Sequence, residues 1–118
     1  MLAENIPLAG GYVYFMKNKS GSVLYIGSTE NLLKRIWEHK SHAVEKSFTD
    51  KYNVEKLVYF ECYPDLSLAR DREYKLKKWR REKKENLINA KNKWQHDLAE
   101  NWFDESYKQS EDFSTNNF

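Results

Sequence analysis

The sequence predicts an α+β or α/β fold in which a small, three-stranded, mainly antiparallel sheet is flanked by helices. Three runs of β-branched and aromatic residues predict the strands, and a short polar turn joins the first two. Segments with helical spacing of apolar residues follow the second and third runs. The predicted order is therefore β-β-α-β-α-α. With 118 residues, 40% of them hydrophobic, the chain can bury the core of one domain.

The first two strands are predicted at 12–16 and 23–27 and form a hairpin. Because side chains alternate between the faces of a strand, Tyr14 faces the same side as its neighbours two positions away. The same rule puts Tyr25 and Gly27 on one face of the second strand. The hairpin can therefore direct two phenols to a common side.

The first helix is predicted to follow a cap at Ser28 or Thr29 and to carry an apolar stripe. Arg35 and His39 are four residues apart, so they lie on one face of this helix. A short helix is expected around 43–46. The stripe consists of Leu32, Leu33, Ile36 and Trp37.

The second half of the domain is predicted to hold one strand and two helices. The strand is expected at 57–62. A long basic helix follows, capped by Asp65 or Ser67, and breaks near Arg81. A further helical segment ends at about Lys91.

The chain divides into a folded domain, residues 1–95, and an acidic C-terminal extension, residues 96–118. From Asp97 to the end, six acids face one base, a net charge of −5. We expect Trp102 to dock a last turn on the body. Residues 105–118 are rich in Ser, Asn and acidic residues and nearly free of aliphatic residues, so we expect them to be disordered.

The single cysteine excludes a disulfide framework and a four-thiolate zinc site. Cys62 is of a residue type that is usually buried, and a lone thiol suits a reducing cytoplasm. Residues 1–11 lack the basic and apolar regions of a signal peptide. No stretch approaches the roughly 20 apolar residues that a membrane-spanning helix needs. We therefore expect a cytoplasmic protein that does not enter a membrane.

The overall net charge of +2 hides a basic segment. Between Arg70 and Lys84, nine bases face three acids, a net charge of +6. A polyanion is the simplest partner for such a stretch, although a solvated helix face has the same composition. The bases that we expect to hold a phosphate backbone are Lys75, Lys77, Lys78, Arg80, Arg81, Lys83 and Lys84.

Five residues that can perform chemistry occur in a distinctive order. Tyr14, Tyr25, Arg35 and His39 are separated by 11, 10 and 4 positions on the hairpin and the helix after it. Glu73 follows on the long basic helix. A surface glutamate or a strand tyrosine is common when it stands alone, so the order and spacing carry the signal.

This pattern resembles the GIY-YIG nuclease family over about residues 11–91. The segments 24–29, 35–40 and 72–79 look most like the small stand-alone bacterial members, which are similar to the nuclease subunit of the Slx-type structure-specific endonuclease. Two positions depart from the pattern. The first glycine of the family name falls at Tyr12, and some relatives carry a lysine where this chain has Ser28.

The resemblance implies a role for each of the five residues. Glu73 is the carboxylate that holds a single divalent ion, Mg²⁺ or Mn²⁺, which neutralises the phosphate and the leaving oxygen. Arg35 clamps the scissile phosphate with its planar fork. One of Tyr14 and Tyr25 is the general base and the other orients water or phosphate, in an order left open. His39 binds phosphate or relays a proton.

The leading functional prediction is a metal-dependent endonuclease acting on DNA. The chain leaves no room for a separate recognition domain, so we expect cleavage directed by DNA shape or only weakly sequence-specific, in repair or recombination, with or without a recruiting protein. Gly27 is expected to form a turn or to let the backbone approach the nucleic acid.

Two alternatives remain open from the sequence. One is a nucleic-acid-binding module that keeps the fold without cleaving, with RNA as an alternative to DNA. The other is a protein-interaction domain that docks a partner through the region of Trp94 and Trp102. The interaction domain has no use for two phenols, a guanidinium and an imidazole at one point, whereas the binding module can share them.

Overall fold

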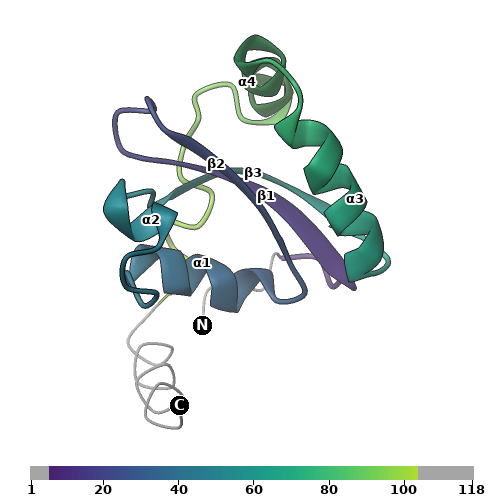
Figure 1. Ribbon diagram of the computed structural model, residues 1–118, viewed down its shortest axis with the longest axis horizontal. Coiled ribbons are helices and arrows are strands. Elements are labelled where there is room, and N and C mark those ends of the chain that lie inside the picture. Colours follow the sequence, from purple (N-terminus) through teal and green to yellow (C-terminus); the bar gives the residue numbers. More distant parts are fainter. Residues whose placement is uncertain (1–5, 104–118) are drawn as a thin grey trace, which may run out of the picture.

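The computed structural model describes residues 6–103 and contains a three-stranded antiparallel sheet with helices on both faces (Figure 1). The strands are β1 (Gly11–Lys17), β2 (Leu24–Thr29) and β3 (Lys56–Tyr63), in the spatial order β2-β1-β3. β1 is the central strand and is buried along its whole length. The predicted fold class is confirmed, and so is the order of elements, with one additional short helix before β3.

The predicted hairpin is confirmed. β1 and β2 pair so that Tyr14 lies opposite Gly27 and Met16 lies opposite Tyr25. In the turn, Gly21 has a φ of +80°, which glycine adopts without steric cost. The Val23 N–H donates to the Asn18 side chain over 2.9 Å and closes the turn.

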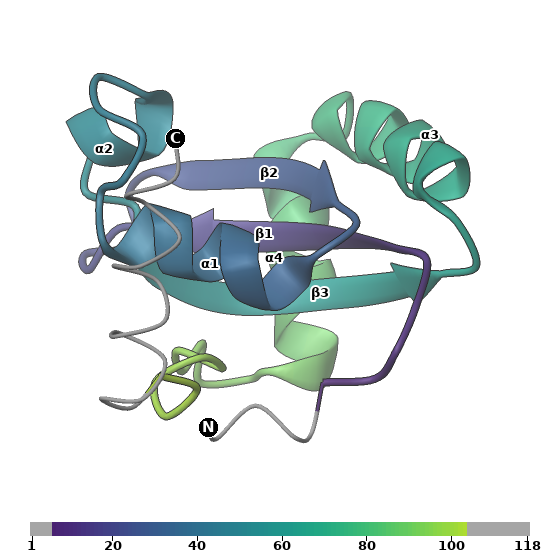
Figure 2. The same cartoon turned by 90° about the horizontal axis from the view of Figure 1, so that it is seen from below.

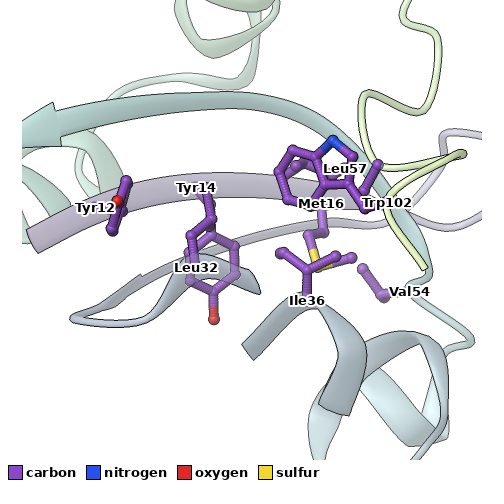
Figure 3. Packing of buried hydrophobic residues seen from close by; sticks show 9 residues of the cluster. Tyr12, Tyr14, Met16, Leu32, Ile36, Val54, Leu57 and Trp102 are labelled. Atoms are coloured by element: carbon purple, nitrogen blue, oxygen red, sulfur yellow. The ribbon is translucent and has the colours of Figure 1, made fainter. Parts of the chain in front are cut away.

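The two faces of the sheet have separate cores, as the alternation along β1 predicts. On one face Tyr14 and Met16 point toward Leu32 and Ile36 of α1 (Leu32–Lys40), as Figure 3 shows. On the other face α3 (Leu66–Lys77) and α4 (Arg81–Lys91) cover the sheet (Figure 2). The core on that face includes Val13, Phe15, Ile26, Val58, Ala69, Leu76 and Ile88.

The start of α1 differs from the prediction. β2 continues through Thr29, so neither Ser28 nor Thr29 is the cap. Asn31 caps the helix instead, and its side-chain oxygen accepts the Lys34 N–H over 3.1 Å. The predicted cap was wrong because the strand is two residues longer than its apolar run.

The short helix also lies elsewhere. α2 spans Phe48–Lys51, not residues 43–46, and Ser47 caps it by accepting the Asp50 N–H over 3.2 Å. His42 and Lys46 have φ values of +58° and +64°, which a right-handed helix does not contain. This irregular segment carries α2 to the end of β2 that joins the hairpin turn (Figure 1).

The two helices after β3 follow the prediction. Asp65 caps α3 by accepting the Leu68 N–H over 2.9 Å. α3 ends at Lys77, and α4 begins at Arg81, where the break was predicted. The strand between Lys56 and Tyr63 is also confirmed, one residue longer at each end.

The segment after α4 packs along the outer edge of β3. The Asn92 amide donates to the Val58 carbonyl over 3.0 Å, and the Leu98 N–H donates to the Leu57 carbonyl over 2.8 Å. Trp102 is buried in the core of the α1 face, which confirms its predicted docking. The packed body therefore reaches beyond residue 95. The division into two domains stays a prediction, and the disorder predicted for residues 105–118 lies outside the described residues.

A further expectation concerns the burial of Cys62. Cys62 is exposed on β3, so the expectation that it is buried was wrong. Cys62 lies two residues after Phe60, on the same face of β3, but the side chains of β3 from Phe60 to Tyr63 are only partly buried, so that face leaves the thiol exposed.

Within residues 6–103, none of the helices has the length and apolar character needed to cross a bilayer.

Candidate active site

Tyr14, Tyr25 and His39 form a tight cluster on the α1 face of the sheet. The Tyr14 hydroxyl lies 2.9 Å from His39 Nε2. The ring centroids of Tyr14 and Tyr25 are 6.1 Å apart, and that of Tyr25 is 5.5 Å from that of His39. β1, β2 and α1 each contribute one member, so the hairpin and the following helix build the cluster together.

Gly27 makes room for this cluster. It lies inside β2 and has no positive φ, so the predicted turn at this residue was wrong. A Cβ at this position would come within 2.5 Å of the Tyr14 hydroxyl and 3.0 Å of the Tyr25 ring. The Tyr14 phenol occupies the space that a side chain at position 27 would fill. The predicted approach of the backbone to nucleic acid stays a prediction.

Gly27→Ala is expected to destabilise the protein by about 1–3 kcal/mol, because the new methyl group overpacks against the Tyr14 ring. Urea unfolding measures this cost. Combined with Tyr14→Ala, the same substitution should cost much less, because the ring that it meets is gone. Equal costs in the two backgrounds would contradict the steric explanation.

His39 is held at both ring nitrogens. Nε2 faces the Tyr14 hydroxyl, and Nδ1 lies 2.8 Å from Thr49 Oγ1 of α2. Burial, with a further contribution from the Arg35 charge, lowers the pKa of His39 to about 4. The imidazole is therefore neutral near pH 7. A neutral ring has one donor and one acceptor, which these two hydroxyl groups satisfy.

The buried histidine makes stability depend on pH. Because the pKa of His39 is lower in the folded chain than its ordinary value of 6.5, the unfolded chain binds more protons here. The free energy of unfolding is expected to fall by up to about 3 kcal/mol as the pH drops from about 6.5 to about 4. His39→Gln should remove this dependence in denaturation curves at pH 7 and pH 5.

His42 must be controlled for, because its contribution to the pH dependence of the free energy of unfolding has the opposite sign to that of His39. Hydrogen bonds to Glu55 and Asp50 raise its pKa, so its contribution is present at low pH and is lost as the pH rises through its folded pKa. The His39 effect is therefore best measured in a His42→Gln background. A slope that His39→Gln leaves unchanged in that background would refute the assignment.

The Tyr14 hydroxyl is a protonated group. Burial raises the pKa of Tyr14, Tyr25 adds to the rise, and the nearby Arg35 charge only partly opposes it. Tyr14 is fully buried, whereas Tyr25 is partly exposed. Tyr14 can therefore donate a hydrogen bond to His39, and Tyr25 is the phenol that solvent reaches.

Arg35 joins this cluster to an open cleft. Its guanidinium Nε donates to Glu38 over 3.2 Å, and its charge acts on both Tyr14 and Tyr25. A cleft of about 330 Å³ opens between α1 and the start of α3, and Arg35 lines it. The other lining residues are Ser28, Thr29, Glu30, Asn31, Lys34, Glu38, Leu66 and Arg70.

A second cleft of about 310 Å³ lies on the other side of Arg35. Tyr25, His39 and Arg35 all line it, together with residues that lead into α2. Arg35 is thus shared between two clefts and is only partly buried. A phosphate in either cleft can reach its planar fork.

Glu73 approaches the site from the opposite layer. It projects from α3, where one carboxylate oxygen accepts the Ser28 hydroxyl and the other lies 2.5 Å from Lys77 Nζ. Ser28 also lines the first cleft with Arg35. The structure therefore brings four of the predicted residues together directly and connects the fifth, Glu73, through Ser28 at the edge strand.

The carboxylate of Glu73 suits a hard cation. Within residues 6–103, no three His, Cys, Asp or Glu side chains gather as a ligand set, so a closed metal cage is absent from this part of the chain. Mg²⁺ needs no such cage, because it keeps several waters and binds through one or two carboxylates and substrate phosphates. Each carboxylate oxygen also has a second lone pair available beside the Ser28 and Lys77 contacts. A single-carboxylate site at Glu73 therefore fits.

The predicted phosphate-binding bases separate into groups. Lys77, Arg81 and Lys84 line a cleft beside Tyr25, whereas Arg80 and Lys83 line one on the far side of α4. Lys78 lies over the Tyr74 ring, with its Nζ 4.0 Å from the centroid. The remaining base, Lys75, is exposed on α3. The first group is the one adjacent to the candidate active site.

The sequence did not predict the roles of two residues at the site. Thr49 orients His39 from ten residues away, and no pattern in the sequence marks it. Ser28 was noted as a candidate helix cap and as a departure from a lysine, but not as a partner of Glu73, which its hydroxyl contacts. The serine in place of a lysine was the available signal, because its small side chain leaves room for Glu73, which a lysine would displace.

Comparison with known proteins gives the family. A profile described as the GIY-YIG catalytic domain matches residues 10–86. The chain belongs to the GIY-YIG nuclease family. The resemblance seen in the sequence is thereby confirmed, while the closer likeness to the Slx-type subunit stays a prediction.

Among the GIY-YIG relatives are several proteins named UPF0213. One from Clostridium perfringens is 44% identical over 80 residues, which cover 68% of this chain and 84% of the relative. One from Bacillus pumilus is 39% identical over 77 residues, covering 65% and 76%. The NMR structure of a UPF0213 protein from Bacillus halodurans shares 33% identity, covers 70% of this chain and 85% of its own, and has a TM-score of 0.45.

Proposed function

We propose that this GIY-YIG protein is a metal-dependent endonuclease that hydrolyses phosphodiester bonds in DNA. Membership of a nuclease family supports hydrolysis of a nucleic acid. The observation that carries the proposal is the position of Arg35, whose guanidinium lies beside the Tyr14–Tyr25–His39 cluster and lines two open clefts. Because Arg35 lines both clefts, its guanidinium is suited to hold a scissile phosphate while the nucleotides on either side of that phosphate extend into the two clefts.

Arg35 stabilises the phosphate in this proposal. Negative charge develops on the phosphate oxygens in the transition state, and a fixed guanidinium favours that charge more than it favours the ground state. Glu38 accepts from Nε and Tyr14 also contacts the guanidinium, so the remaining N–H donors of the fork are the ones that a phosphate can use. Glu38 therefore acts as a positioning residue for Arg35.

Tyr25 is the phenol that we assign to the attacking water. It lines the cleft that Arg35 and His39 share, whereas Tyr14 is fully buried and donates to His39. The Arg35 charge acts on Tyr25, and a cation beside the attacking water favours the negative charge that develops there in the transition state. Tyr14, His39 and Thr49 then form a hydrogen-bonded chain that fixes the position of the Tyr25 ring.

Glu73 is the residue that would hold the divalent ion, Mg²⁺ or Mn²⁺. When bound, such an ion neutralises charge on the phosphate and on the leaving oxygen. The Ser28 hydroxyl orients the Glu73 carboxylate toward the edge of β2, next to the cleft with Arg35. The Lys77 ammonium lies against the same carboxylate and competes with any cation that binds there.

The substrate proposal follows from the positive charge of α3 and α4. The basic residues of α3 and α4 suit a phosphate backbone and supply no reading of base sequence. We therefore propose cleavage directed by DNA shape or with weak sequence preference, by residues 1–95 and with residues 96–118 as an acidic extension. A role in repair or recombination in the cytoplasm, with or without a recruiting protein, completes the proposal.

The test compares branched, flapped, nicked and plain duplex DNA in Mg²⁺ or Mn²⁺. The wild-type protein is expected to cut at least one of the branched or flapped substrates faster than plain duplex. Arg35→Ala and Glu73→Ala proteins made in the same way exclude a contaminating nuclease. Cleavage that both variants retain in full would overturn the proposal.

A non-cleaving nucleic-acid-binding module is the second candidate. The contacts of Glu73 with Ser28 and Lys77 favour it, because both carboxylate oxygens already have partners. This candidate predicts salt-sensitive binding to DNA or RNA with no cleavage in any divalent ion. The same substrate panel therefore decides between the two.

A further inference from the structure

Three aromatic rings lie in a row beside the candidate active site. Tyr25 stacks on Phe48 of α2, with centroids 5.8 Å apart and an interplanar angle of 29°. Phe48 in turn contacts Tyr52, with centroids 4.8 Å apart. Phe48 is 48% exposed and Tyr52 is 41% exposed. Two large rings thus face solvent at the end of a row that begins in the active-site cluster.

Several cations lie next to the row formed by Tyr25, Phe48 and Tyr52. A cleft of about 360 Å³ is lined by the Tyr25 and Phe48 rings together with the cations Lys77, Arg81 and Lys84. Lys51 Nζ lies 5.4 Å from the centroid of the Tyr52 ring. Aromatic faces next to positive charge are the combination that holds an unpaired strand of nucleic acid, by base stacking and phosphate contacts.

The cations that line this cleft are presented to solvent, even though two of them have acidic partners. The side chains of Lys77 and Arg81 are 54% and 46% exposed. Their partners Glu73 and Glu85 are only 18% and 25% exposed and lie deeper. A phosphate arriving from solvent therefore meets the cations first.

The Tyr25–Phe48 pair is also the wall of the cleft that contains Arg35 and His39. The same two rings thus separate the reaction site from the cationic cleft. A nucleotide next to the scissile phosphate can place its base on Phe48 and Tyr52 only if that base is not already stacked within a duplex. Paired and stacked bases do not offer a free face to a protein ring.

We propose that Phe48 and Tyr52 stack an unpaired base next to the cleaved bond, so that the substrate is a nucleic acid with a single-stranded segment at the site. This inference rests on the proposed function and names its substrate class. Lys77, Arg81 and Lys84 hold the phosphates of the unpaired segment. A flap or a gapped branch satisfies both contacts, whereas a continuous duplex satisfies only the phosphate contacts.

The experiment measures binding without divalent ions, so that it does not depend on cleavage. Fluorescence anisotropy compares a labelled 12-nucleotide single strand, its blunt duplex and a flapped duplex at one salt concentration. Phe48→Leu with Tyr52→Ala is expected to weaken binding of the single strand and the flap by about 10-fold or more. Binding of the blunt duplex should change by less than about twofold.

Control variants separate stacking from damage to the fold. Phe48→Trp keeps an aromatic face and should retain single-strand affinity, and Tyr52→Ala alone should show part of the loss. Trp94→Ala removes a more exposed ring, 73% accessible, on the segment after α4 and should have no effect. Thermal unfolding checks that each variant is folded, and Tyr52→Ala remains informative if the double variant is not.

The outcomes distinguish this inference from the proposed function. Unchanged single-strand affinity in the folded variants would overturn the inference and would leave the rings to another ligand, such as a protein. A wild-type protein that binds single strands through Phe48 and Tyr52 but cuts nothing in Mg²⁺ or Mn²⁺ would support the inference and overturn the endonuclease.

Discussion

Arg35→Ala is expected to lower the single-turnover rate of DNA cleavage by about 10²–10³-fold, because it removes the fixed charge that stabilises the transition-state phosphate. The substitution leaves the core intact, since the Arg35 side chain is partly exposed and its ion pair is with Glu38 on the same helix. Rates at saturating protein on a flapped substrate measure the effect. Binding in the absence of divalent ions should change far less than the rate.

Arg35→Lys is the matched control. It keeps the charge and loses the planar fork, so its rate is expected to fall between those of the wild type and Arg35→Ala. A second readout is independent of cleavage: the Arg35 charge contributes to the low pKa of His39, so that pKa should rise in Arg35→Ala when followed by NMR. A wild-type rate in Arg35→Ala, with the His39 pKa raised, would place the phosphate elsewhere.

Much of the fold follows from strict local patterns. The alternation along β1 predicted that Tyr14 and Met16 face one layer and Phe15 the other, and the two cores divide in that way. The Asp65 cap and the break before Arg81 were equally local signals. Period-two and capping patterns act over a few residues, so a single sequence is enough to detect them.

The errors lie where distant contacts decide the backbone. The segment 42–46 is polar and short, and its left-handed residues His42 and Lys46 are fixed by partners that the sequence does not pair. The His42 ring contacts Asp50 and Glu55, 8 and 13 positions away. Helix propensity ignores such contacts, so it placed α2 too early.

The same distinction applies to the site. The positions of Tyr14, Tyr25, Arg35 and His39 follow from one hairpin and one helix, whose geometry is set locally. The link between Ser28 and Glu73 joins residues 45 positions apart across two layers, and only the packing of α3 on the sheet creates it. The contact between Ser28 and Glu73 depends on tertiary packing, so it could not be predicted from the sequence.

Glu73→Gln is expected to lower the cleavage rate on the order of 10³-fold or more, because the amide keeps the shape of the side chain but lacks the negative charge that holds a divalent ion. The loss should persist when Mg²⁺ or Mn²⁺ is raised tenfold above the concentration that saturates the wild type. Glu82→Gln removes an exposed carboxylate from α4 and should leave the rate unchanged.

Lys77→Met tests the competition at the same carboxylate from the other side. Without the ammonium that lies 2.5 Å from Glu73, a divalent ion has one cation fewer to displace, so half-maximal activity should require less metal. Binding of DNA should weaken slightly, because Lys77 also lines the cationic cleft. If Glu73→Gln keeps the wild-type rate and Lys77→Met leaves the metal requirement unchanged, then the ion binds elsewhere, and the contacts of Glu73 serve only to fasten α3 to the edge of the sheet.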